Sequence, residues 1–192
     1  VWGTDSLKGK KVAMQGFGKV ATYTAHHLIK EDSQIVVTDI DEEALDRARK
    51  LGLPVVAPDE IYDVECDIFS PCALGGVINP DTIPRITARV IAGGANNQLL
   101  TEADGEELHR RGVLYAPDYL INAGGIINVS AEIGTPYSAD RAREKTERIY
   151  EIMSRVIQVS KKEEISIAKA ADRIAEQRLA SVRAIKTIYR SR

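Results

Sequence analysis

Short apolar runs recur along the first part of the chain, and polar stretches long enough to form helices separate them. Each run has only four or five residues and few charges, which is typical of a strand buried on both faces of a sheet. The predicted strands are residues 11–15, 34–38, 54–57, 67–70, 89–92 and 113–116. Strands that alternate with helices predict an α/β fold with a doubly wound, mostly parallel sheet.

Beyond residue 140 the pattern changes, and apolar side chains recur at helical spacing. This spacing predicts two long C-terminal helices, each with an apolar face that docks on the sheet, on another domain or on a second subunit. The apolar positions are Ile149, Ile152, Val156 and Val159 in the first helix, and Ile167, Ala171, Ile174, Val182 and Ile185 in the second. We therefore divide the chain into a sheet domain at residues 1–140 and a helical extension at residues 141–192.

A glycine-rich turn joins the first predicted strand to a predicted helix at residues 19–30. Gly16 permits the tight turn, Gly18 lets a pyrophosphate approach the backbone, and Ala21 keeps the helix close to the strand. The free N–H groups at the start of the helix then face the diphosphate. Asp39 ends the next strand, where a carboxylate accepts hydrogen bonds from an adenosine ribose and repels a 2′-phosphate. The sheet domain is thus predicted to be a Rossmann-type domain that binds NAD rather than NADP, the alternative being a tight turn without a ligand.

Loops that follow the later strands carry glycine and asparagine. They include Cys72 and Ala73 after the fourth run, Gly93–Asn97 after the fifth, and Asn122 shortly after the sixth. In an open α/β sheet the carboxyl ends of the strands line one crevice, and ligands bind there. Each asparagine alone is more typical of a turn or a helix cap. Their convergence on one rim favours contact with a ligand, because an amide both donates and accepts hydrogen bonds.

Composition excludes several classes of protein. The 192 residues are 44% hydrophobic with a formal net charge of −2, which suits a globular protein able to bury a core. The formal net charge is −9 for residues 1–140 and +7 for residues 141–192. Because acidic residues are interleaved with the basic residues of the tail, nucleic acid is not an expected partner. The sequence shows no membrane span or signal peptide, so we expect no membrane partner and a cytoplasmic location. Cys66, Cys72 and three histidines lack the spacing of a disulfide or a metal site, so neither is predicted.

Five longer stretches carry a more specific signal than the glycine motif, and they are distributed along nearly the whole chain, tail included. They are Gln15–Val20, Val64–Gly76, Val90–Leu99, Tyr115–Gly125 and Ala170–Arg178. These stretches resemble the C-terminal, nucleotide-binding part of the glutamate/leucine/phenylalanine/valine dehydrogenase family. The resemblance implies reversible, NAD-dependent oxidative deamination of an L-amino acid to its 2-oxo acid and ammonia.

The resemblance also implies which residues contact the cofactor. It assigns the pyrophosphate to Gly16, Gly18 and Val20, and the adenosine ribose to Asp39. It places Cys72 and Ala73 on the adenine side, and Ala95, Asn96 and Asn122 on the nicotinamide side. Phe17 and Lys19, which lie within the glycine-rich turn, are also expected to contact the cofactor, although Lys19 departs from the family pattern. Lys19 adds a cation beside the pyrophosphate. Cys72 has no accompanying histidine motif, so we do not assign it as a nucleophile.

For the substrate, the resemblance implies that Asn97 orients the amino acid and that Ile126 and Val129 line its side-chain pocket. These aliphatic side chains favour a branched aliphatic substrate, because burial of each methylene is worth about 0.8 kcal/mol. The family's catalytic lysines and aspartate belong to an N-terminal substrate domain that nothing in this sequence matches. No catalytic residue is therefore assigned in this chain, and the expected partners are that domain and further copies in a homo-oligomer.

Two other functions fit the same sequence. A stand-alone NAD-binding regulatory module without turnover also explains the missing lysines. An assembly role, in which the tail helices mediate oligomerisation and the cofactor is structural, is the third interpretation.

Overall fold

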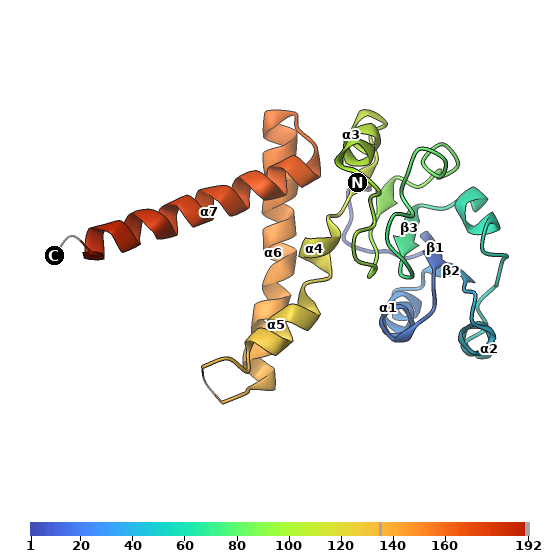
Figure 1. The fold of residues 1–192 in the computed structure, drawn as a ribbon. Helices are drawn as coiled ribbons and strands as arrows, with labels where there is room; N and C mark the ends of the chain where they lie inside the picture. The colour runs from blue at the N-terminus through green and yellow to red at the C-terminus, as the bar shows by residue number, and fades with distance from the viewer. Residues whose placement is uncertain (135, 191–192) are drawn as a thin grey trace.

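A parallel sheet of five strands forms the centre of the molecule (Figure 1). The computed structural model describes residues 1–134 and 136–190, with side chains described as far as residue 183. The order across the sheet is β2-β1-β3-β4-β5, and each neighbouring pair is parallel. The strands are β1 (Lys11–Gln15), β2 (Gln34–Thr38), β3 (Ile68–Pro71), β4 (Val90–Ile91) and β5 (Leu114–Tyr115). The predicted fold class is therefore confirmed.

The predicted strand at residues 54–57 is wrong. Val55 forms only an isolated parallel bridge with Val37 of β2. The Val37 N–H donates to the Pro54 carbonyl at 2.9 Å, and the Val56 N–H donates to the Val37 carbonyl at 3.0 Å. Pro54, the first residue of this run, and Pro58, which follows it, limit the pairing, because proline fixes its own φ and has no N–H to donate.

Helices connect the strands and cover the sheet. α1 has the predicted bounds, Lys19–Lys30. The other connecting helices are α2 (Glu42–Lys50), the short 3-10 helix η1 (Glu60–Asp63), α3 (Glu102–Arg110), α4 (Asp118–Ile121) and α5 (Gly124–Ser130). No helix among residues 1–134 and 136–190 is both long and apolar enough to cross a membrane.

Two apolar cores lie on opposite faces of the sheet, because successive strand residues point to opposite sides. Met14 of β1 belongs to the core beside α1 and α2, which also contains Ala44. Ala13, one residue earlier, belongs to the opposite core together with Ile61 of η1 and Leu108 of α3. Both faces are covered, which explains why the strands are continuous apolar runs in the sequence.

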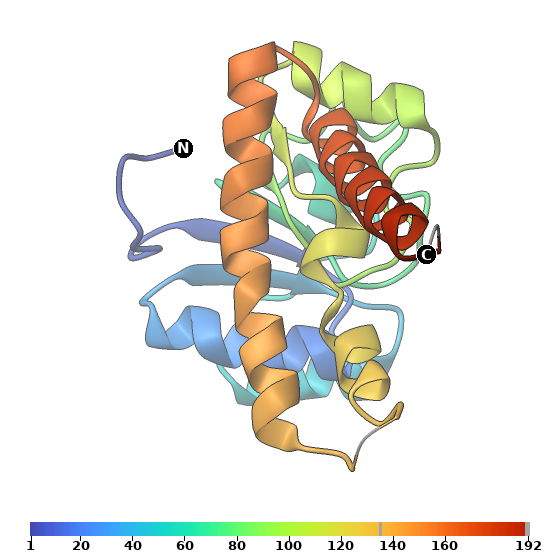
Figure 2. The same ribbon diagram turned by 90° about the vertical axis from the view of Figure 1, so that its left-hand side faces the viewer.

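Two long helices, α6 (Ala139–Glu163) and α7 (Ile167–Arg190), complete the chain, as predicted. The Ser138 hydroxyl accepts the Arg141 N–H at the start of α6, and the left-handed Glu164 ends this helix. α6 packs on α4 and α5, and α7 packs on β5. Beyond this contact α7 projects away from the body of the molecule (Figures 1 and 2). The division of the chain at residue 140 stays a prediction.

The apolar faces of α6 and α7 are buried only in part. Val156 of α6 and Ala171 of α7 belong to a small core between the two helices. Ile152 and Val182, which the helical spacing assigns to the same faces, are 42% and 44% exposed. The side chain of Ile185 lies outside the described residues. Among the described side chains, Val182 of α7 therefore lies outside the contacts that bury Ala171.

The strand order reverses at β1, which lies between β2 and β3. The chain runs outward from β1 to β2 and then crosses back to β3 on the other side of β1. At such a reversal the connecting loops diverge to opposite faces, and a crevice opens beyond the carboxyl ends of the strands. The glycine-rich loop after β1 and the Cys72 loop after β3 meet at this point.

Candidate functional site

Gly16 makes the turn from β1 toward α1 in a conformation that suits only glycine. Its φ is +92°, and its N–H donates to the Thr38 carbonyl of β2 at 2.7 Å. A Cβ added at Gly16 would lie 2.8 Å from both the N and the Cβ of Ala73. The predicted tight turn is thus present, and it lies directly against the loop that follows β3.

The N-terminus of α1 has the features of an anion site. Gly18 is the N-cap, no side chain caps this end, and the first turn has no acidic residue. A Cβ on Gly18 would meet no atom within 4 Å, so the space beside these N–H groups is open. Lys19 and Val20 are exposed in the first turn. Phe17 differs, because its side chain is fully buried in the core and only its backbone faces the loop.

Asp39 lies beside the glycine-rich loop, as predicted. One carboxylate oxygen accepts the Phe17 N–H at 2.5 Å, and the other accepts the Asp41 N–H at 2.9 Å. Each carboxylate oxygen can accept more than one hydrogen bond, so these contacts leave capacity for hydroxyl donors. The side chain therefore also fixes the loop, a role that the sequence analysis missed.

The loops after β3 and β4 pack against each other beside α1. The Ala95 N–H donates to the Pro71 carbonyl at 2.9 Å, and the Gly94 N–H donates to the Cys72 sulfur at 3.4 Å. A Cβ on Gly94 would lie 2.8 Å from Cγ1 of Val20. Burial raises the pKa of the Cys72 thiol, with a smaller opposing effect of its hydrogen bonds to Ser70 and Gly94. A raised pKa disfavours the thiolate and agrees with a packing role for this cysteine.

The predicted nicotinamide-side asparagines contact each other. Nδ2 of Asn122 donates to Oδ1 of Asn96 at 2.9 Å, although the two residues belong to different loops. Asn97 is exposed and adopts the left-handed φ of +52°. Its carbonyl accepts the Gly76 N–H at 2.7 Å, which connects it to the loop after β3.

The predicted substrate-pocket residues lie on α5, just after Asn122. Ile126 and Val129 are 73% and 59% exposed and lie about one helical turn apart. Side chains this apolar and this exposed are available to a ligand or to another protein surface. A hollow of about 730 Å³ reaches Asn97 and is lined also by Leu100, Tyr119 and Asp172.

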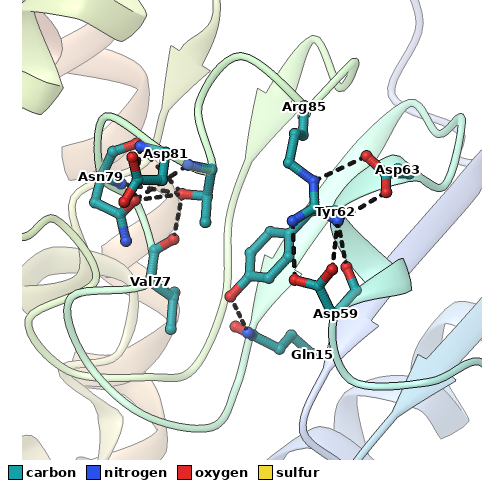
Figure 3. Close-up of polar contacts among 9 residues, drawn as sticks. Gln15, Asp59, Tyr62, Asp63, Val77, Asn79, Asp81 and Arg85 are labelled. Carbon is teal, nitrogen blue, oxygen red and sulfur yellow. Dashed lines mark hydrogen bonds and ion pairs between the residues drawn. The ribbon is translucent and has the colours of Figure 1, made fainter.

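An arginine clamp that the sequence analysis missed lies close to the glycine-rich loop (Figure 3). The Arg85 guanidinium bridges Asp59 at 2.8 Å and Asp63 at 2.7 Å and lies over the Tyr62 ring. The Tyr62 hydroxyl accepts a hydrogen bond from Nε2 of Gln15 at 2.5 Å. Hydrogen bonds from Arg85 hold the pKa of both aspartates below the usual range. The clamp thus reaches the residue that immediately precedes Gly16.

A second cluster of polar contacts, around Asn79 and Val77 (Figure 3), lies next to Gly76, whose N–H donates to the Asn97 carbonyl. The Thr82 hydroxyl donates to the Val77 carbonyl at 2.6 Å, and Nδ2 of Asn79 donates to the Gly76 carbonyl at 2.9 Å. The Asn79–Thr82 spacing is a local signal for this loop that the sequence analysis did not use. The part of the chain that the structure describes contains no cluster of His, Cys, Asp or Glu suited to a metal ion.

Comparison with known proteins identifies the chain that carries this site. A model of the Glutamate/Leucine/Phenylalanine/Valine dehydrogenase family matches residues 42–186. The chain belongs to this family. Leucine dehydrogenase of Bacillus cereus is 48% identical over 189 residues, which are 98% of this chain and 51% of that protein. The family resemblance is therefore confirmed over nearly all of the chain.

Solved structures of two family members agree with the fold. L-tryptophan dehydrogenase from Nostoc punctiforme, known from its crystal structure, is 41% identical in sequence to this chain. The two structures match with a TM-score of 0.91 over 95% of this chain and 56% of that chain. A hetero-hexameric glutamate dehydrogenase from Thermus thermophilus is 25% identical, with a TM-score of 0.72 over 92% of this chain and 47% of that chain. This chain thus spans about half the length of the relatives that it matches.

Proposed function

We propose that this chain is the NAD-binding part of an amino-acid dehydrogenase that converts a branched-chain L-amino acid reversibly to its 2-oxo acid and ammonia. The convergence of three features where the strand order reverses carries the proposal: the Gly16 turn, the uncapped start of α1 and the Asp39 carboxylate. A pyrophosphate needs N–H donors at close range, and a ribose needs an acceptor beside them. Family membership supports the reaction, since the similar relatives are leucine, tryptophan and glutamate dehydrogenases.

Each part of the site has its own role in holding the cofactor. The first-turn N–H groups of α1 and the Lys19 ammonium receive the pyrophosphate. Asp39 accepts the ribose hydroxyls and repels a 2′-phosphate, which favours NAD over NADP. Cys72 borders the adenine side, and the Asn96–Asn122 pair borders the nicotinamide side. When bound, NAD supplies the acceptor for the hydride that leaves the substrate α-carbon.

The substrate lies on the Asn97 side of the crevice in this proposal. The Asn97 carboxamide orients the amino acid through hydrogen bonds, because it has both donors and an acceptor. Ile126 and Val129 contact the aliphatic side chain of the substrate, and this contact covers two side chains that are exposed here. The 48% identity to leucine dehydrogenase supports an aliphatic substrate.

The acid–base groups of the reaction come from outside these 192 residues. Apart from Lys19 and Cys72, which border the cofactor, the site residues are glycines, amides, apolar side chains and a carboxylate that already accepts two N–H groups. None of them has the setting of a general base. We therefore assign proton transfer to a separate substrate domain, and we expect the assembly to be a homo-oligomer.

Titration with NADH and NADPH tests the cofactor, and NAD reduction by leucine, valine and glutamate in the presence of the substrate domain tests the reaction. We expect NADH to bind more tightly than NADPH and the aliphatic amino acids to react faster than glutamate. NADH binding without any deamination would support the regulatory-module interpretation instead. Absence of NADH binding would refute both.

A further inference from the structure

The side chain of Gln98 holds the Gly93–Asn97 loop from its buried side. Gln98 has no exposed surface. Its Nε2 donates to the carbonyls of Gly93 at 2.7 Å and of Ala95 at 2.9 Å. Since both partners are acceptors, the position needs a side chain that donates twice from one nitrogen.

The other end of the same carboxamide has no partner. Oε1 of Gln98 is buried and accepts no hydrogen bond from the described residues. A buried acceptor without a donor destabilises a fold, and an apolar side chain of similar shape would avoid this penalty. The benefit of Gln98 therefore lies in the shape that its two donated bonds impose on the loop.

Asp118 connects this loop to α4. Its carboxylate is buried and accepts the Gln98 N–H at 2.8 Å and the Tyr119 N–H at 2.6 Å. Its backbone carbonyl accepts the Asn122 N–H at 2.8 Å. One buried residue thus fixes both the end of the Gly93–Asn97 loop and the segment that carries Asn122.

The two braced segments meet at the Asn96–Asn122 hydrogen bond, which closes a ring through Gln98 and Asp118. Asn96 is exposed, whereas Gln98 and Asp118 are buried and act only through their neighbours. We propose that Gln98 and Asp118 are positioning residues that hold the Asn96–Asn122 pair in the geometry required by the nicotinamide end of the cofactor. This inference rests on the proposed function.

Separate titrations with NADH and with ADP-ribose test the inference, because ADP-ribose has the adenosine and the diphosphate but lacks the nicotinamide. Asp118→Asn leaves one N–H without an acceptor, and Gln98→Met removes both donors while keeping a side chain of similar length. We expect each variant to bind NADH at least about tenfold more weakly, the effect of one or two hydrogen bonds. ADP-ribose should bind as it does to the wild type. An equal loss for both ligands, or no loss for either, overturns the inference.

Asp104→Asn is the matched control, because Asp104 is equally buried and accepts the N–H and the hydroxyl of Thr101 at 2.8 Å each, at the start of α3. It should lower the melting temperature and leave the ratio of the two affinities unchanged. Asn96→Ala changes an exposed member of the pair itself, so it is informative even where a buried variant does not fold. It must weaken binding of NADH and not of ADP-ribose; otherwise the inference fails. A wild-type protein that binds neither ligand refutes the proposed function, whereas unaltered binding in the variants refutes only this inference.

Discussion

The Asp39 carboxylate accepts the Phe17 N–H at 2.5 Å and so joins the end of β2 to the glycine-rich loop after β1. The side chain that we assign to the ribose thus also shapes the loop that we assign to the pyrophosphate. Its negative charge and its hydrogen-bond acceptors are separable by substitution, because asparagine keeps one acceptor oxygen and loses the charge.

Asp39→Asn should therefore shift cofactor preference, although it also removes the acceptor of one of the two N–H groups that the carboxylate holds. Loss of the charge removes repulsion of a 2′-phosphate, and we expect the ratio of NADPH to NADH affinity to rise by about tenfold. Calorimetric titration with both cofactors measures this ratio. Asp41→Asn, at the N-cap of α2, is the control and should not change it. An unaltered ratio in Asp39→Asn would remove Asp39 from the ribose site.

Gly16→Ala should destabilise the protein more than the same change at another left-handed glycine. Gly9 has a φ of +72° and open space around its missing Cβ, so Gly9→Ala tests backbone strain alone. We expect this strain to lower the free energy of unfolding by about 1 kcal/mol. At Gly16 the new methyl group also meets Ala73, and we expect a loss of about 3 kcal/mol. Urea unfolding measures both free energies. Equal losses would show that the two loops separate easily.

Asn97 offers a test that distinguishes substrate contact from cofactor contact. Because Asn97 has a φ of +52°, Asn97→Gly removes the carboxamide without straining the backbone. In the protein together with the proposed substrate domain, kcat/KM for the amino acid should fall by about 10- to 100-fold, while the NADH dissociation constant changes by less than about threefold. Equal losses in both measurements would contradict a substrate role. Asn97→Ala serves as the comparison and adds the strain.

Removal of the Arg85 clamp should change how stability depends on pH. Arg85 keeps the pKa of Asp59 and Asp63 lower in the folded chain than the unfolded value of about 3.9. These carboxylates therefore stabilise the fold above that pH, and the contribution is lost as the pH falls through the folded pKa. Urea midpoints of the wild type and of Arg85→Met should differ at pH 7 and differ less at pH 3, which lies below the unfolded pKa.

The control for the clamp is Arg110→Met, which removes a single exposed ion pair with Glu107 on the surface of α3. Such pairs contribute little, so its midpoint should stay close to that of the wild type at both pH values. A pH-independent difference between the wild type and Arg85→Met would mean that Arg85 acts through its packing on Tyr62 instead.

Local elements were the most predictable part of the fold. β1, β2 and α1 have the predicted bounds, because their signals lie in consecutive residues: a short apolar run or a helical period next to a glycine turn. The later strands were harder, since β4 and β5 each keep two residues of a four-residue apolar run. Strand length depends on the neighbouring strand, which the run itself does not encode.

By itself the sequence determined the α/β class, the Gly16 turn, the position of Asp39 at the end of β2 and the resemblance to a dehydrogenase family, because each is written in adjacent or regularly spaced residues. Only the tertiary structure decided that the Gln98 side chain braces its own loop and that Asp118 connects this loop to α4. It also decided that Arg85 reaches Asp59 and that Val182 stays exposed. The physical reason is that a side chain's partners are set by strand order and helix packing, which bring together residues distant in the chain. Hydrogen bonds and burial depend on these long-range contacts, whereas the periodicity of apolar residues can be read from the sequence alone.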